Sequence, residues 1–223
     1  MKYAIIVPAR KGSQDLKNKN LVYLKSNRLI EYTFNSVKNI NVLKFILSDH
    51  PKIKKIAKRF GFITDYNRPK ITSGSKASLV STLLHFLKWS EKKYEIDYFV
   101  ILQPTSPLRA KIDILKSIEK VKKNKLTSLF SISESLEHPY ETINLFKSEK
   151  WSYVLPKAKK FYRRQDFDIN SFFINGAIYI VSTRYLNFKK NLISNKHGVY
   201  IMPKIRSLDI NDLQDLEIAE KIL

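Results

Sequence analysis

Short apolar runs alternate along the chain with segments whose apolar residues recur every three or four positions. The apolar runs predict strands over residues 2–8, 44–47, 62–65, 98–102, 127–132, 172–182 and 199–202. The helical spacing predicts helices over residues 29–39, 52–60, 77–92, 111–123 and 212–223. Because strands and helices alternate, we expect a three-layer α/β fold with helices on both faces of a mostly parallel sheet.

Residues 134–172 interrupt this alternation. The segment is polar and aromatic, and residues 141–146 form a short strand-like piece. We interpret it as an inserted β-rich arm that serves oligomerisation rather than as a separate domain. Residues 1–223 are therefore expected to form one domain that carries this arm.

Polar loops follow three of the predicted strands, at residues 9–20, 48–49 and 103–109. Ligands of such sheets lie beyond the carboxyl ends of the strands, so we expect these loops to share one crevice. In the first loop, Gly12 permits close approach of the backbone to phosphate oxygens, and Arg10, Lys11 and Lys19 can neutralise their charge. The Gly-Lys-Ser/Thr ending of a P-loop is absent, and a turn with surface lysines is the alternative.

Two further segments offer polar groups, one suited to a polyhydroxylated ligand and the other to a carboxylate. Gln103, Thr105 and Ser106 follow a strand in a loop that two prolines stiffen, which suits a polyhydroxylated ligand. Arg163 and Arg164 form a pair suited to a carboxylate. The alternatives are a plain proline-rich turn and a charged surface of the arm.

The net charge of +21 is the strongest compositional signal. Nucleic-acid binding is one interpretation, but the lysines are spread over predicted helix faces, and no nucleic-acid-binding signature accompanies them. A Lys-rich surface whose positive field attracts anionic ligands is the interpretation that we favour. The sequence has no cysteine, which excludes disulfides, thiolate zinc sites and a cysteine nucleophile. Neither a membrane-spanning run nor a signal-peptide pattern is present, so we expect a cytoplasmic protein.

Four segments together resemble the CMP-N-acylneuraminate (sialic acid or nonulosonic acid) cytidylyltransferases. They are residues 7–13 with Lys19 and Asn20, residues 102–109, residues 175–180 and residues 207–211, and they occur in the order of the family. The resemblance implies a Rossmann-like nucleotidyltransferase that transfers CMP from CTP to the anomeric hydroxyl of N-acetylneuraminate, legionaminate or a similar acid. It also implies Mg²⁺ and a homodimer in which the arm can reach the neighbouring site.

The resemblance assigns roles to individual residues. It implies CTP contacts by Ala9, Arg10, Lys11, Gly12, Ser13, Lys19, Asn20, Arg68 and Ser78. It implies sugar contacts by Gln103, Thr105, Ser106, Arg164, Asn175 and Tyr179. Asp209 and Asn211 would hold Mg²⁺, and the catalytic residues would be Arg10, Lys19, Arg164 and Asp209. No residue is an obvious general base.

Three departures from the family pattern leave alternatives open. Gln14 stands where the family usually has a phosphate-binding lysine, Ser75-Lys76 replaces Asp-Thr, and Asn211 replaces a second aspartate. A degenerate homologue that binds nucleotide or acidic glycan without turnover is therefore an alternative to the enzyme. The related ketodeoxyoctonate cytidylyltransferases rank lower, because they lack the motifs at residues 103–109 and 175–179.

Overall fold

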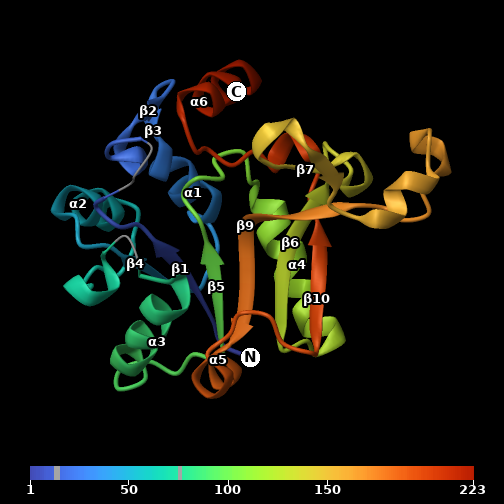
Figure 1. The fold of residues 1–223 in the computed structure, drawn as a ribbon. Helices are drawn as coiled ribbons and strands as arrows, with labels where there is room; N and C mark the ends of the chain where they lie inside the picture. The colour runs from blue at the N-terminus through green and yellow to red at the C-terminus, as the bar shows by residue number, and fades with distance from the viewer. Residues whose placement is uncertain (13–15, 75–76) are drawn as a thin grey trace.

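A six-stranded sheet forms the centre of the protein (Figure 1), seen in a computed structural model that describes residues 1–12, 16–74 and 77–223. Its strands, in spatial order, are β10 (His197–Ile201), β6 (Ser128–Glu134), β9 (Phe172–Ser182), β5 (Tyr98–Leu102), β1 (Tyr3–Pro8) and β4 (Leu43–Leu47). Strand β9 runs antiparallel to both of its neighbours, and the other paired strands are parallel. The predicted mostly parallel sheet is confirmed.

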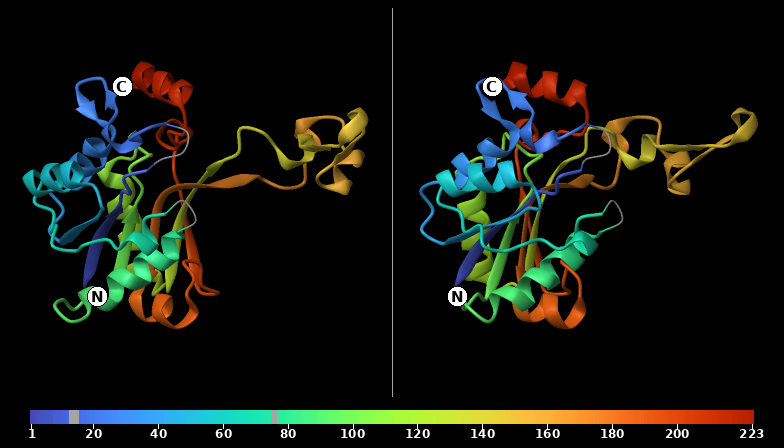
Figure 2. Two further views of the ribbon diagram at one scale, coloured as in Figure 1. Left: turned by 60° about the vertical axis from the view of Figure 1, so that its left-hand side comes forward. Right: turned by 90° about the vertical axis from the view of Figure 1, so that its left-hand side faces the viewer.

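Helices cover both faces of this sheet (Figures 1 and 2). They are α1 (Leu29–Val37), α2 (Pro51–Arg59), α3 (Leu79–Ser90), α4 (Lys111–Asn124), α5 (Thr183–Lys189) and α6 (Leu213–Ile222). One core cluster joins α1, α2 and α4 to the sheet, and the cluster on the opposite face joins α3 and α5 to it. Because successive strand residues point to opposite faces, buried strands such as β1 contribute to both clusters.

Local chemistry explains where the elements begin and end. Ser78 caps α3 by accepting a hydrogen bond from the Ser81 backbone amide at 3.0 Å, so this helix starts later than residue 77. Gly61 follows α2 with φ of 77°, which confirms the predicted glycine stop. Residues 62–65 form a single bridge, Phe45 to Ile63, rather than the predicted strand. Helix α5 and the hairpin of β2 (Tyr23–Leu24) and β3 (Asn27–Arg28) were not predicted.

The arm leaves the sheet after β6 and returns at β9, and Figure 2 shows it projecting away from the rest of the protein. It contains the hairpin of β7 (Ile143–Leu145) and β8 (Trp151–Tyr153). Four 3-10 turns complete it: Pro139–Glu141, Lys147–Glu149, Pro156–Lys160 and Arg164–Asp166. Its base is held by packed rings, Tyr140 with Phe161 and Phe167. The strand-like piece predicted at residues 141–146 contains β7, the pairing of β7 with β8 was not predicted, and dimerisation stays a prediction.

No helix in the described part of the chain is both long enough and apolar enough to span a bilayer.

Candidate active site

A cavity of about 320 Å³ opens at the carboxyl ends of β1 and β5. It is lined by Pro8, Arg10, Gly12, Lys19, Asn20, Arg68, Ala77, Leu79, Thr82, Gln103, Pro104, Thr105, Asp209 and Asn211. The loop after β4 lies beside it, because the Asp49 carboxylate accepts a hydrogen bond from the Lys11 backbone amide at 2.8 Å. The predicted shared crevice is therefore present, and it brings together residues from five separate stretches of sequence.

The loop after β1 folds back on the far end of the chain. Lys19 is buried, and its Nζ donates to the Ile210 carbonyl oxygen at 3.0 Å. Asn20 donates from Nδ2 to the Arg10 carbonyl oxygen at 3.3 Å, and Arg10 donates from Nη1 to the Gly74 carbonyl oxygen at 3.1 Å. These contacts fix two cationic side chains around the cavity. Ser13 and Gln14 lie outside the described residues, as do Ser75 and Lys76.

Arg68 closes another side of the cavity. Its guanidinium donates to the Thr72 carbonyl oxygen from Nε at 3.0 Å and to Thr82 Oγ1 from Nη2 at 3.1 Å. Burial lowers its pKa, and the nearby Asp49 carboxylate opposes that shift. The side chain thus joins the start of α3 to the end of β4, where Leu47 supplies a third acceptor. Ser78 does not line the cavity, and its hydroxyl serves as the helix cap.

The loop after β5 contributes Gln103, Pro104 and Thr105 to the cavity wall. The Thr105 carbonyl oxygen accepts a hydrogen bond from the Ile210 backbone amide at 2.8 Å, which ties this loop to the segment that carries Asp209. Ser106 was predicted to contact the sugar, but its side chain is buried and does not line the cavity. The turn that follows Pro104 directs it into the protein instead.

Asn175 requires a second correction, because its amide is buried and occupied by the protein itself. Its Oδ1 accepts from Ser131 Oγ at 2.5 Å and from the Ala177 backbone amide at 3.1 Å, and its Nδ2 donates to Ser207 Oγ at 3.0 Å. Nδ2 also donates to Met202 Sδ at 3.4 Å, so neither end of the amide is left for a sugar. It fixes the backbone of β9 against the turn before Asp209.

Among the described residues that line this cavity, Asp209 is the one carboxylate. Burial raises its pKa, while the Thr105 hydroxyl, the Asn211 amide and the Lys19 ammonium oppose that shift. A partly buried carboxylate of this kind is stabilised by a cation. Among the described residues, no group of three or more His, Cys, Asp or Glu side chains is placed to hold a metal. One carboxylate and the neighbouring Asn211 oxygen still fit Mg²⁺, which retains waters and shares its shell with substrate phosphates.

Tyr179 lies on β9 near this carboxylate but does not line the cavity. Burial is the main reason that its pKa is raised, and the charge of Asp209 adds to the shift. The ring packs with the core cluster on the α3 and α5 face of the sheet. The position is compatible with a ligand that extends past Asp209, and a contact between Tyr179 and a sugar stays a prediction.

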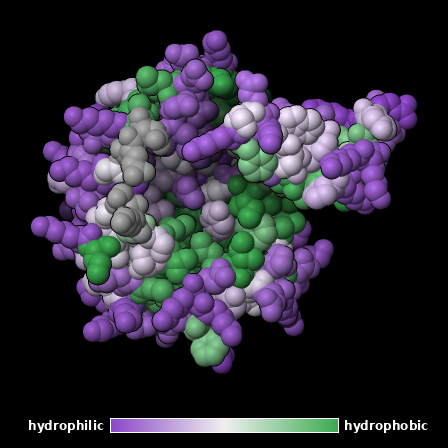
Figure 3. Space-filling model, viewed as in Figure 1, coloured by the Kyte–Doolittle hydropathy of each residue, from purple (hydrophilic) through white to green (hydrophobic). Residues whose placement is uncertain are grey.

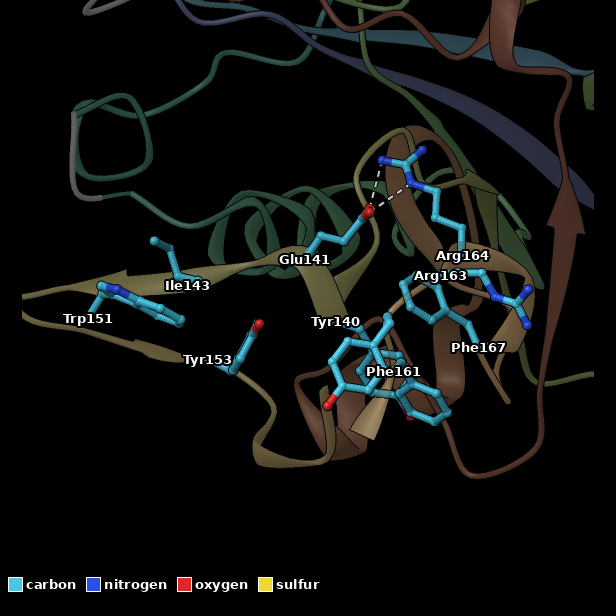
Figure 4. A pocket seen from close by; sticks show the side chains of 10 residues that line it. Tyr140, Glu141, Ile143, Trp151, Tyr153, Phe161, Arg163, Arg164 and Phe167 are labelled. Carbon is cyan, nitrogen blue, oxygen red and sulfur yellow. Dashed lines mark hydrogen bonds and ion pairs between the residues drawn. The ribbon is translucent and has the colours of Figure 1, made fainter. Parts of the chain in front are cut away.

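The arginine pair lies on the arm, which projects away from the rest of the protein (Figure 2), and neither arginine lines this cavity. Arg164 is exposed and forms ion pairs with Glu141 at 2.7 Å and Glu137 at 3.5 Å. Arg163 forms a two-bond pair with Asp166, with both distances 2.9 Å. Both arginines line a second hollow of about 310 Å³ whose other walls are mostly aromatic (Figure 4). Within one chain, the structure therefore does not bring Arg164 to Gln103 or Asp209.

Several lining residues were missed from the sequence. Pro8, Ala77, Leu79, Thr82 and Pro104 all line the cavity. Thr82 Oγ1 accepts a hydrogen bond from Arg68, but in the sequence it reads as one more core position of a helix. Leu79 and Thr82 lie in the first turns of the helix predicted over residues 77–92. Because helix N-termini often face anionic ligands, their place in the sequence was a signal for a position at the cavity.

Comparison with protein families gives one match over nearly the whole chain. A family model described as cytidylyltransferase matches residues 4–221. Among curated proteins, the post-translational flagellin modification protein B of Campylobacter coli is 26% identical over 96% of this chain and 92% of its own length. The pseudaminic acid cytidylyltransferase of Campylobacter jejuni is 26% identical, over 99% of this chain and 95% of its own length.

A third relative is longer. The N-acylneuraminate cytidylyltransferase of Streptococcus agalactiae is 28% identical over 96% of this chain, which spans only 52% of that protein. Among solved structures, a CMP:2-keto-3-deoxy-manno-octonic acid synthetase in complex with CTP superposes with a TM-score of 0.72 at 15% identity, covering 100% of this chain and 98% of its own. The 4-diphosphocytidyl-2C-methyl-D-erythritol synthase of Anaerococcus prevotii superposes with a TM-score of 0.63 at 9% sequence identity, covering 99% of this chain and 97% of its own. These two structures share the fold of this chain.

Proposed function

Because the chain belongs to the cytidylyltransferase family, we propose that it transfers CMP from CTP to the anomeric hydroxyl of a nonulosonic acid. The anomeric oxygen forms a bond to the α-phosphorus, the bond between that phosphorus and the bridging oxygen breaks, and pyrophosphate leaves. The hydroxyl proton passes to solvent. The products are a CMP-sugar and pyrophosphate.

One observation carries this proposal: basic side chains and one carboxylate line the same cavity at the strand ends. Arg10, Lys19 and Arg68 suit a triphosphate, and Asp209 with Asn211 suits a Mg²⁺ ion that the triphosphate shares. When bound there, Mg²⁺ neutralises phosphate charge and polarises the phosphoryl oxygens. The protein side chains hold CTP in place and stabilise the charge that develops as pyrophosphate departs.

The acceptor is proposed to lie between Gln103 and Asp209, because both side chains line the cavity. Gln103 offers an amide donor and an acceptor to sugar hydroxyls, whereas the Thr105 hydroxyl is buried and faces Asp209. Two relatives are named for N-acylneuraminate and pseudaminic acid, which supports an acidic nine-carbon sugar as the acceptor class. No histidine or second carboxylate among the described residues lines this cavity, so catalysis is assigned to positioning and charge stabilisation.

The test is pyrophosphate release from CTP across a panel of nonulosonic acids, with ketodeoxyoctonate as a control acceptor. We expect turnover with at least one nonulosonic acid, loss of turnover with EDTA, and recovery with excess Mg²⁺. Turnover with ketodeoxyoctonate alone would assign the related octonate activity instead. CTP binding by calorimetry, without turnover on any acceptor, would indicate a degenerate binding protein.

Replacement of Lys19 by methionine is expected to lower kcat/KM for CTP by about 10²-fold, because a fixed charge near the phosphates is lost. The side chain is buried beside Ile210, so methionine retains most of the packing. Steady-state kinetics with CTP varied, together with thermal unfolding, checks the effect. Lys25→Met is the matched control, since Lys25 is exposed in the β2–β3 turn. Equal effects of the two substitutions would contradict a local role for Lys19.

The arm and the uncovered sheet face support a homodimer as part of the proposal. On β6, Ile132 pairs with Ile174 of β9 on one side and with Ile201 of β10 on the other. The side chain of Ile174 is 48% exposed, and that of Ile201 is 58% exposed. The arm adds exposed Leu145 and Trp151. Figure 3 shows hydrophobic surface gathered below the arm on this face. A second copy of the chain would cover this surface and bring its own Arg164 towards the acceptor.

Ile201→Glu is expected to weaken this self-association more than tenfold, because it places a charge in the apolar row. Light scattering after size exclusion, over a range of protein concentrations, measures the change. Phe188→Glu is the control, since Phe188 is 78% exposed and its helix α5 lies at the opposite end of the sheet from the arm (Figure 1). A wild-type protein that is monomeric at all concentrations would refute the dimer.

A further inference from the structure

Arg109 is a buried cation whose side-chain hydrogen bonds join the loop that carries Gln103 to a neighbouring strand and helix. Its side chain is 3% exposed. Nη1 donates to the Gln103 carbonyl oxygen at 3.0 Å and to the Ala177 carbonyl oxygen at 2.7 Å, and Nη2 donates to Thr33 Oγ1 at 2.8 Å. One guanidinium therefore joins the loop after β5, the strand β9 and helix α1.

The part of β9 that Arg109 holds is a bulge. The register with β6 shifts between Phe130 and Ile132, so that β9 carries extra residues there. Gly176 adopts φ of 71°, a conformation that glycine accepts without strain. A Cβ at Gly176 would lie 3.5 Å from Gln103 Nε2, so the Gln103 amide rests directly on the bulge.

The burial of the Arg109 cation is energetically unfavourable, which indicates that this side chain does more than fill space in the core. Among the described residues, no carboxylate lies within 4.0 Å of the Arg109 guanidinium, and Nε has no hydrogen-bond partner. Burial lowers the pKa of Arg109 to about 9, and the charge of Asp113 opposes that shift only in part. Burying a cation without an ion pair is unfavourable, whereas an apolar side chain would fill the same space at no such cost.

We propose that Arg109 is a positioning residue that fixes Gln103 over the β9 bulge and so preforms the acceptor side of the cavity. The inference rests on the proposed function for the identity of the acceptor, but not for the geometry. A guanidinium is suited to this role because its planar fork presents several donors in fixed directions. Its Nη1 donates to two carbonyl oxygens from different segments while Nη2 donates to Thr33 on a third, and a lysine ammonium on a shorter stem cannot reach all three acceptors at once.

The experiment compares Arg109→Lys with Thr33→Val. The lysine keeps the charge but loses the fork, whereas the valine removes the third acceptor and leaves the bonds to Gln103 and Ala177 in place. Hydrogen exchange is measured on the acceptor-free proteins, followed by KM for the acceptor and for CTP. In Arg109→Lys we expect faster exchange in peptides over residues 102–109 and 173–179, and an acceptor KM raised about tenfold or more. KM for CTP should stay within about threefold of wild type.

Two further variants test the role of Arg109, and the first of them does not depend on the folding of Arg109→Lys. Gly176→Ala strains the bulge from the other side and should raise the acceptor KM in the same selective way, including when Arg109→Lys fails to fold. Gln103→Ala should make the effect of Arg109→Lys on the acceptor KM largely disappear, because the two act through one contact.

Three outcomes would overturn the inference. They are unchanged hydrogen exchange in Arg109→Lys, an equal rise of KM for the acceptor and KM for CTP in that variant, and the same rise of the acceptor KM in Thr33→Val. If the wild-type protein turns over no acceptor, the proposed function fails, and the exchange comparison alone decides whether Arg109 holds this loop.

Discussion

Replacement of Asp209 by alanine is expected to lower kcat/KM by about 10³-fold or more, the largest loss of activity for any single substitution in the cavity. The expected loss corresponds to about 4 kcal/mol of transition-state stabilisation, the size of effect that a metal-bound phosphoryl centre supplies. Asp209 is the carboxylate among the described residues that line the cavity, so no neighbouring side chain replaces it. The substitution also leaves the Lys19 ammonium without the charge that faces it.

Kinetics with CTP and Mg²⁺ both varied measures this effect, and Asp212→Ala is the control. Asp212 carries the same charge three positions away, but its carboxylate caps α6 by accepting from the Asp215 amide at 3.0 Å. Its loss should cost about 1 kcal/mol of unfolding free energy and leave turnover within about threefold. Asp209→Ala with wild-type activity and wild-type Mg²⁺ dependence would show that the cation is held elsewhere.

The architecture and the location of the site could be predicted because each depends on a local pattern. Buried apolar runs marked β1 and β5 with nearly the observed ends, and polar loops directly followed them. Parallel strands place such loops at one edge, so the shared cavity followed from the order of the elements. The four motifs were sufficient to identify the family, which the match over residues 4–221 confirms.

The individual roles within the motifs were harder to predict, because the same residue types serve the backbone and a ligand equally well. Asn175 and Ser106 read as polar wall residues, yet a bulge in β9 and the turn after Pro104 direct both inward. The bulge depends on pairing with β6, which is distant in sequence. Arg109 closes the same motif as Gln103, and only the folded chain shows that its partners include Ala177 and Thr33.

The largest loss of stability is expected from Asp113→Ala. This carboxylate is fully buried, and its oxygens accept from Arg206 at 2.8 and 2.9 Å, from the Tyr200 hydroxyl at 3.0 Å and from the Ala110 amide at 2.9 Å. Alanine removes all four bonds and leaves the Arg206 guanidinium without its anion. We expect the unfolding free energy to fall by about 3–5 kcal/mol, towards the lower value because Arg206 is partly exposed.

Urea unfolding of Asp113→Ala and of Arg163→Ala shows whether the loss of stability comes from the burial of the ion pair or from ion pairing alone. Arg163 and Asp166 make an equally well-aligned two-bond pair, but the Arg163 side chain is 72% exposed, so its loss should lower the unfolding free energy far less than the loss of Asp113. Equal costs for the two variants would mean that the Asp113 network adds nothing beyond a surface pair. A larger cost for Asp113→Ala would show that this buried network, which links α4 to Arg206 three residues before Asp209, stabilises the fold beyond the contribution of a surface pair.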